Sequence, residues 1–170
     1  FLKFYSTLNK AKDVMYQSLL ILPLIPLEEE KVYNKIVSNK LSKEEIIEEL
    51  MKLYMMRGED IKFFVYLPLT FADYPYTNEV VKIAIIFRAL QLLSKDKRDL
   101  QWDLYHKTPS PLVSLYLTDI DEKTKEEIVN AVEKKLRDML DSHLKYLSQK
   151  KEKERIEILR DYLYQRIENI

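Results

Sequence analysis

The chain has 170 residues, and 28 lysines and arginines balance 28 aspartates and glutamates. This length suits one domain with a sizeable core, and the zero net charge argues against a surface that binds nucleic acid or anionic lipid over its whole extent. Cysteine is absent, which excludes zinc fingers, iron–sulfur clusters, disulfides and thiol catalysis. The single glycine, Gly58, excludes the glycine-rich phosphate loops of Rossmann and P-loop proteins.

Composition and the N-terminal residues also indicate the kind of source organism and the cellular compartment. Little glycine, abundant lysine, glutamate and isoleucine, and no cysteine are typical of thermophilic, and in particular archaeal, proteins. The N-terminal apolar residues are spaced as one face of a helix, not as a continuous apolar core, so no secretory signal is predicted. We therefore expect a cytoplasmic protein.

The N-terminal segment, residues 1–22, is predicted to be an amphipathic helix. Its apolar residues recur at steps of three and four, which places them on one face that we expect to pack inward: Phe1, Phe4, Tyr5, Leu8, Ala11, Met15, Leu19 and Leu22. Pro23 and Pro26 cannot continue this helix and are predicted to end it.

Two further helices are predicted before residue 60. The first spans about residues 28–39 and carries glutamates in its first turn, where carboxylates suit the helix dipole. The second begins at Ser42, which with Glu45 forms the sequence of a capping box. Gly58 follows this helix, so we expect it to adopt the left-handed conformation that often ends helices.

Residues 61–76 are ambiguous. Their aromatic and β-branched residues favour a strand, but Pro68 would restrict such a strand to the edge of a sheet. A short two-stranded ribbon with residues 113–118 is one alternative, and a helix followed by a loop is the other and favoured one.

Residues 78–94 are predicted to form the helix around which the domain is built. Apolar side chains occur on nearly every side of this run, and only Lys82, Arg88 and Gln91 interrupt it. A helix that is apolar all round is a buried helix, and this run is too short to cross a membrane.

A long helix is predicted from a second capping-box sequence at Thr124, with an apolar face ending near Leu147. The apolar stripe of the C-terminal residues 152–170 is rotated by roughly 160° from that face, at 100° per residue. Either the chain turns near Ser148 or the C-terminal stripe faces another surface. Packing within the chain and pairing with a partner are both open for this helix, and the candidate partner interface is Ile156, Leu159, Leu163, Arg166 and Ile167.

Three acidic patterns are weak candidates for chemistry. Asp103 and His106 are spaced as two metal ligands on one helical face, but the second such pair of a di-metal bundle is missing. Asp119 and Asp121 resemble a cation site but precede a helix, where aspartates serve as caps. Most of the glutamates at 44, 45, 48 and 49 are predicted to face solvent, and only burial would raise the pKa of a carboxyl group toward that of a general acid. No catalytic residue, metal or cofactor is predicted.

Residues 95–107 combine cations with aromatic rings, the mixture that contacts phosphates and stacks on bases. The candidate nucleic-acid contacts are Lys95, Lys97, Arg98, Trp102, Tyr105, His106 and Lys107. In the alternative interpretation, which we favour, Trp102 and Tyr105 are core residues and the charges form a solvated face.

Together, these patterns predict a single, mainly α-helical domain of about six helices around residues 78–94, with residues 152–170 as a protruding or partner-binding helix. The predicted function is that of a non-catalytic subunit or interaction module of a larger assembly, with a protein partner or a second copy of the chain and no membrane contact. The alternative is an accessory subunit of a replication, repair or CRISPR-type complex that contacts single-stranded nucleic acid. A third hypothesis is a hydrolase or transferase whose residues are scattered in the sequence.

Overall fold

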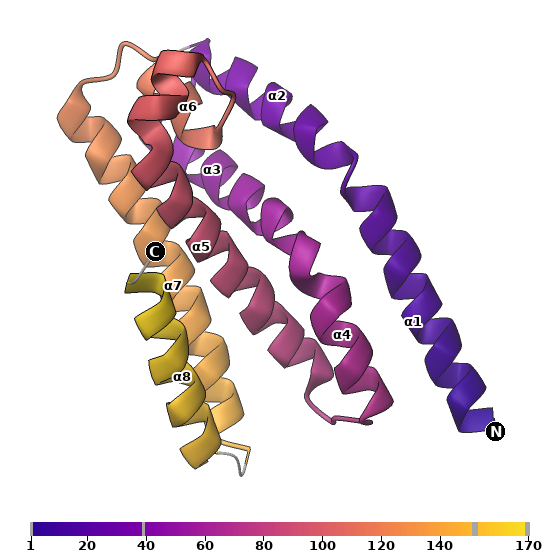
Figure 1. Cartoon of the computed structure of the whole chain (residues 1–170). Coiled ribbons are helices and arrows are strands. Elements are labelled where there is room, and N and C mark those ends of the chain that lie inside the picture. The colour runs from indigo at the N-terminus through magenta and orange to yellow at the C-terminus, as the bar shows by residue number, and fades with distance from the viewer. Residues whose placement is uncertain (1, 39, 151–152, 169–170) are drawn as a thin grey trace.

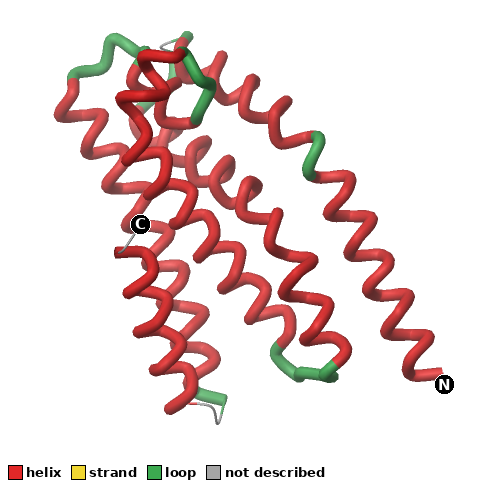
Figure 2. The backbone as a smooth tube through the Cα atoms, in the orientation of Figure 1, coloured by secondary structure: helices red, strands yellow, loops and turns green. Residues whose placement is uncertain are grey.

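A computed structural model shows a mainly helical protein (Figures 1 and 2). It describes residues 2–38, 40–150 and 153–168. Within them lie one short 3-10 helix, η1 (Gly58–Ile61), and eight α-helices: α1 (Leu2–Ile21), α2 (Leu24–Val37), α3 (Lys43–Arg57), α4 (Lys62–Phe71), α5 (Thr77–His106), α6 (Pro111–Tyr116), α7 (Glu122–Ser148) and α8 (Lys153–Glu168). The six predicted helices are present, α4 corresponds to the favoured helical alternative for residues 61–76, and α6 comes in addition.

Helix α5 is the centre of the fold, as the sequence predicts. It packs against α3, α4, α6, α7 and α8, and the buried residues along it lie on several sides of the helix: Val81, Ile83, Ile85, Ile86, Ala89, Leu90, Leu92, Leu93 and Leu100. The helix runs twelve residues past the predicted end at Ser94, to His106. No glycine or proline interrupts it, and Leu100 continues its buried side.

The ambiguous segments are helical. Residues 62–71 form α4, with Pro68 inside it, and residues 111–116 form α6, so the described residues contain no ribbon. Ser110 begins α6 because its hydroxyl accepts a hydrogen bond from the Val113 backbone N–H at 3.3 Å and proline follows at the first helical position. The favoured helical alternative for 61–76 is therefore confirmed.

The structure confirms the cap predicted at the start of α3 and corrects the predicted first residues of α7 and α2. Ser42 and Glu45 form the complete capping box of α3. Helix α7 begins earlier than predicted, because Asp121 accepts from the Thr124 N–H at 2.9 Å and Thr124 lies inside the first turn. Helix α2 begins at Leu24, since the missing N–H of Pro26 removes no hydrogen bond in a first turn.

Gly58 does not adopt the predicted left-handed conformation. Its φ is −68°, an ordinary helical value. Glycine fits here because the backbone of α5 passes very close: a Cβ added at Gly58 would lie 2.5 Å from the carbonyl oxygen of Ile85. The residue is thus a point of close approach between the end of α3 and the central helix.

A buried polar network joins three helices. Asp96 of α5 is buried, and one of its oxygens accepts from the Tyr54 hydroxyl at 2.8 Å and from Arg57 at 2.6 Å. Arg57 also pairs with Glu29 of α2 at 3.2 Å. The Asp96 charge is therefore paired, as a buried charge must be, and burial raises the pKa of Glu29 and of Tyr54.

Candidate functional site

One side of α5 remains open along most of its length, and we call it the outer face of α5. Its members recur at steps of three and four and none is fully buried: Ala84, Phe87, Arg88, Gln91, Lys95, Arg98, Trp102, Tyr105 and His106. The lower half of this face is apolar and the upper half is cationic and aromatic. The two halves offer different chemistry.

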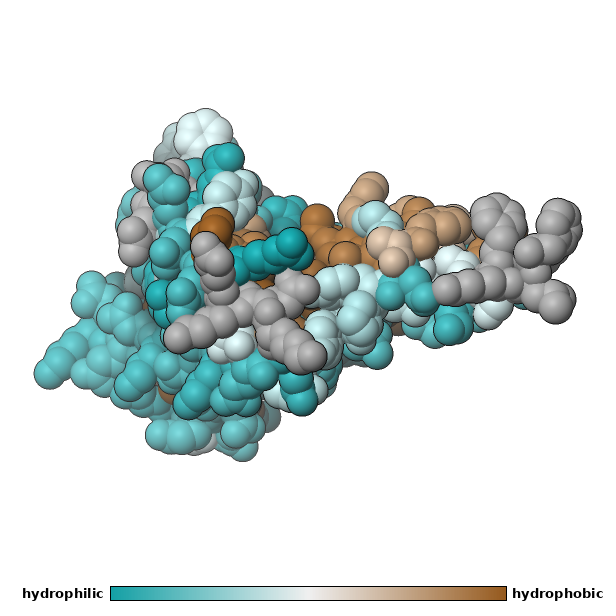
Figure 3. Space-filling view, turned by 90° about the horizontal axis from the view of Figure 1, so that it is seen from below, coloured by the Kyte–Doolittle hydropathy of each residue, from teal (hydrophilic) through white to brown (hydrophobic). Residues whose placement is uncertain are grey.

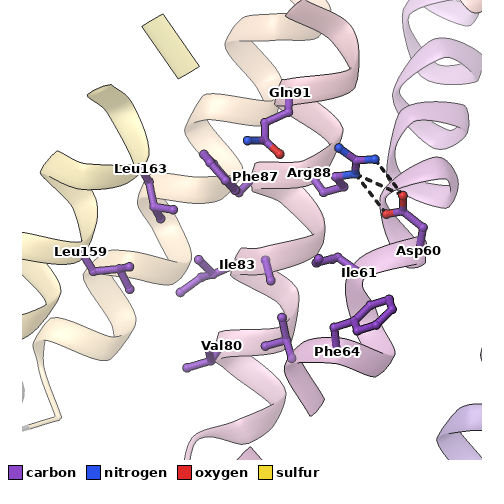
Figure 4. A pocket seen from close by; sticks show the side chains of 12 residues that line it. Asp60, Ile61, Phe64, Val80, Ile83, Phe87, Arg88, Gln91, Leu159 and Leu163 are labelled. Atoms are coloured by element: carbon purple, nitrogen blue, oxygen red, sulfur yellow. Dashed lines mark hydrogen bonds and ion pairs between the residues drawn. The ribbon is translucent and has the colours of Figure 1, made fainter. Parts of the chain in front are cut away.

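The lower half is the floor of an open groove of about 510 Å³ between α4 and α8 (Figure 4). Ile61 and Phe64 line it on one side and Leu159 and Leu163 on the other. Viewed from below, apolar surface is exposed between the α7–α8 end of the molecule and the N-terminal end of α1 (Figure 3).

Arg88 is the main polar group of the groove. Its guanidinium donates three hydrogen bonds to the two carboxylate oxygens of Asp60, at 3.0–3.2 Å (Figure 4). This two-pronged geometry neutralises both charges and fixes the side of the groove. The remaining lining is largely apolar, so the groove suits apolar contact and offers no arrangement for acid–base chemistry.

The upper half ends in three exposed aromatic rings, which we call the aromatic end of α5. Trp102 is 66% exposed and Tyr105 is 81% exposed, so the interpretation of both as core residues is wrong. The His106 ring lies 3.9 Å from Trp102 and 4.9 Å, edge-on, from Tyr105, centroid to centroid. The rings come together because Trp102 and His106 are one helical turn apart, while the core lies on the other side of the helix.

The cations of this segment are divided between two sides of the helix. Lys95 and Arg98 both pair with Asp99, at 3.2 and 3.1 Å, on the outer face. Lys97 points instead toward α7, where it pairs with Glu133 at 2.9 Å. Of the seven candidate nucleic-acid residues, the structure thus sets Lys97 apart from the rings.

Lys107 ends α5 in an unusual conformation. Its φ of 55° is left-handed, and the Thr108 N–H beyond it donates to the Asp103 carbonyl at 2.9 Å. Glycine is the residue that usually ends helices in this way. Here a cation stands beside the exposed rings at a backbone cost of about 1–2 kcal/mol.

The candidate partner interface on α8 lies largely in the chain's own core. Helix α8 runs back beside α7 (Figure 1), so the rotated stripe faces inward: Ile156, Leu163 and Ile167 are buried and Leu159 is partly buried. Arg166 is exposed and donates to the Tyr162 hydroxyl at 3.2 Å. The apolar members are therefore largely covered within the chain, while Leu159 and Leu163 also line one side of the groove.

The predicted N-terminal stripe shows the reverse, because four of its five described side chains face solvent. The helix packs against α4, and Ala11 and Val14 are buried, while the apolar stripe of α1, defined here as Leu8, Met15, Leu19 and Leu22, is exposed. Phe1, and the side chains of Phe4 and Tyr5, lie outside the described residues. The expectation that this stripe packs inward is wrong, and periodicity alone gave no signal of it.

The acidic candidates have structural roles. Asp121 caps α7, and its hydrogen bonds from Thr124 lower its pKa. Hydrogen bonds from Ser42 likewise lower the pKa of Glu45, which is the opposite of what a general acid requires. Among the described residues, no three histidine or acidic side chains are grouped so that they could hold a metal ion.

Comparisons with protein-family models, curated proteins and solved structures give no match. In the described part of the chain, no helix has the length and apolarity needed to cross a membrane.

Proposed function

We propose that the protein is a non-catalytic helical subunit that binds a protein partner through the apolar stripe of α1. The observation that carries the proposal is that four apolar side chains on one side of α1 are 36–55% exposed. Leu19 is 55% exposed and its neighbour Leu20 is 69% exposed. Leu24 and Leu27 at the start of α2 are also exposed, so apolar surface continues past the turn between the two helices.

Such a surface favours association. Exposed apolar residues that gather in one region mark interaction sites in soluble proteins, whereas scattered ones need no explanation. Fully burying one leucine contributes about 1.5–3 kcal/mol, so covering four half-exposed apolar side chains would contribute roughly 3–6 kcal/mol before the costs of association. An amphipathic helix whose apolar side enters a partner's groove is a common mode of recognition.

The test uses Met15→Glu with Leu19→Glu, which places two charges on the stripe. Both side chains are exposed, so the melting temperature should stay close to that of the wild type. Binding to partners captured from the source organism, or self-association in analytical ultracentrifugation, should be lost. Gln17→Glu is the matched control, because Gln17 is exposed on α1 but lies away from the stripe.

Two results would contradict the proposal. If the double variant melts far below the wild type, the stripe is covered within the chain. If the double variant keeps every partner and oligomer of the wild type, the stripe is not the interface.

A further inference from the structure

We infer that the aromatic end of α5 is a stacking site for unpaired bases of single-stranded nucleic acid. Trp102, Tyr105 and His106 expose ring faces at the tip of a helix whose lower part is fixed in the core. The site lies on a different helix from the apolar stripe of α1, so variants of one surface test it without altering the other.

Flat rings with open faces are what sequence-tolerant recognition of single strands requires, because every base has a π-face. The Trp102 ring has His106 against one side and is mostly exposed elsewhere. The Tyr105 and His106 rings stand at 86° to one another, and Tyr105 is 81% exposed, so most of its ring is accessible. A duplex offers no comparable faces, since its bases are already stacked on one another.

The cations lie where a backbone passing the rings would need them. Lys107 follows the rings directly, and Lys95 precedes them on the same outer face. Twelve residues of helix separate the two lysines by about 18 Å, which matches about five stacked nucleotides at 3.4 Å each. Asp99 lies on the same side and pairs with both Lys95 and Arg98, so these three groups together carry one net positive charge.

The left-handed Lys107 makes a discriminating variant available, because glycine would satisfy the helix end without strain. A purely structural role for this residue predicts that Lys107→Gly stabilises the protein and changes nothing else. A phosphate contact predicts that the same variant is more stable and binds single strands less tightly.

The first experiment uses the fluorescence of Trp102, which is the only tryptophan. The full chain is titrated at low salt with a 20-nucleotide oligothymidine, with a duplex of the same length and with thymidine monophosphate. The single strand should quench Trp102, and the duplex should not. Quenching by the mononucleotide as strong as that by the oligonucleotide would overturn the assignment to a strand, and no quenching by the oligonucleotide would overturn the inference altogether.

The second experiment follows a labelled oligothymidine by fluorescence anisotropy. Trp102→Ala should weaken binding by roughly 5- to 150-fold, the fold-change expected for one lost base–ring stack. Lys107→Gly should weaken binding and lower the salt slope by about 0.7, the value for one phosphate on a single strand.

Tyr146→Ala is the matched control, because it removes an exposed aromatic ring from α7. Circular dichroism should show all three variants folded, since each altered side chain is exposed. Unchanged binding in Trp102→Ala, or an equal loss in Tyr146→Ala, would show that the rings of α5 are not the site.

Discussion

Replacing Gly58 by alanine tests the closest approach between two elements of the core. The Gly58 backbone is helical, with φ of −68°. On backbone grounds alone, alanine at such a position stabilises a protein by about 0.4–1 kcal/mol. The space around Gly58 predicts the opposite sign.

The added methyl group would lie 2.5 Å from the Ile85 carbonyl oxygen and 3.3 Å from the Ala89 nitrogen. Real Cβ atoms essentially never approach closer than 3.0 Å, so the end of α3 and α5 must separate by at least half an ångström. Overpacking of this kind costs about 1–3 kcal/mol. Subtracting the backbone gain leaves a net loss of up to about 2.6 kcal/mol, centred at about 1.3 kcal/mol, and at that centre the melting temperature of a chain of this size falls by about 3–5 °C.

Thermal melting followed by circular dichroism measures this difference, and a double-mutant cycle with Ile85→Ala identifies its origin. Truncating Ile85 removes its side-chain methyl, which would lie 3.3 Å from the new group, but leaves the carbonyl in place. If the carbonyl is the obstacle, the two substitutions should be additive. A Gly58→Ala protein that melts at or above the wild-type temperature would refute the reasoning.

Two further predictions concern α8. Leu159→Glu with Leu163→Glu should destabilise the isolated chain by several kcal/mol, because Leu163 is only 7% exposed and Leu159 is partly buried; an unchanged melting temperature would show that α8 is not packed on its own domain. Burial, followed by the neighbouring Asp141 carboxylate, raises the pKa of Tyr164 to about 12. Neutral Tyr164 therefore stabilises the fold fully below its unfolded pKa of about 10, and this contribution is lost as the pH rises toward 12. The wild type should thus lose more of its melting temperature between these pH values than Tyr164→Phe does, and parallel curves would contradict the prediction.

The sequence predicted correctly those parts of the fold whose residue pattern is compatible with only one arrangement. A run that is apolar on every side can only be buried, and α5 is central for that reason. The capping box at Ser42 was equally readable, since it depends on residues three positions apart. The predicted end of α5 at Ser94 was too early. After Ser94 the sequence changes from almost entirely apolar to mostly charged, which suggests a new segment, although no residue there breaks the helix.

Distances across the chain explain the other errors. Gly58 follows a predicted helix, and no local pattern shows that the backbone of α5 passes within contact distance. The segment 62–71 has the composition of a strand, but it packs as a helix between α1 and α5. In both cases tertiary contacts, not local preference, determine the conformation.

Tertiary contacts also decide which of the two predicted apolar stripes, on α1 and α8, is exposed. The stripes of α1 and α8 are both amphipathic, and periodicity states that each has an apolar side but not whether the fold covers it. Helix α8 packs against α5 and α7, so its apolar stripe is buried within the chain although it is rotated from the stripe of α7. Among the described residues, the α1 stripe is not covered in this way, and its four members stay exposed although α1 packs against α4. The described helices leave this apolar side of α1 open, and for this reason the proposed partner interface lies on α1.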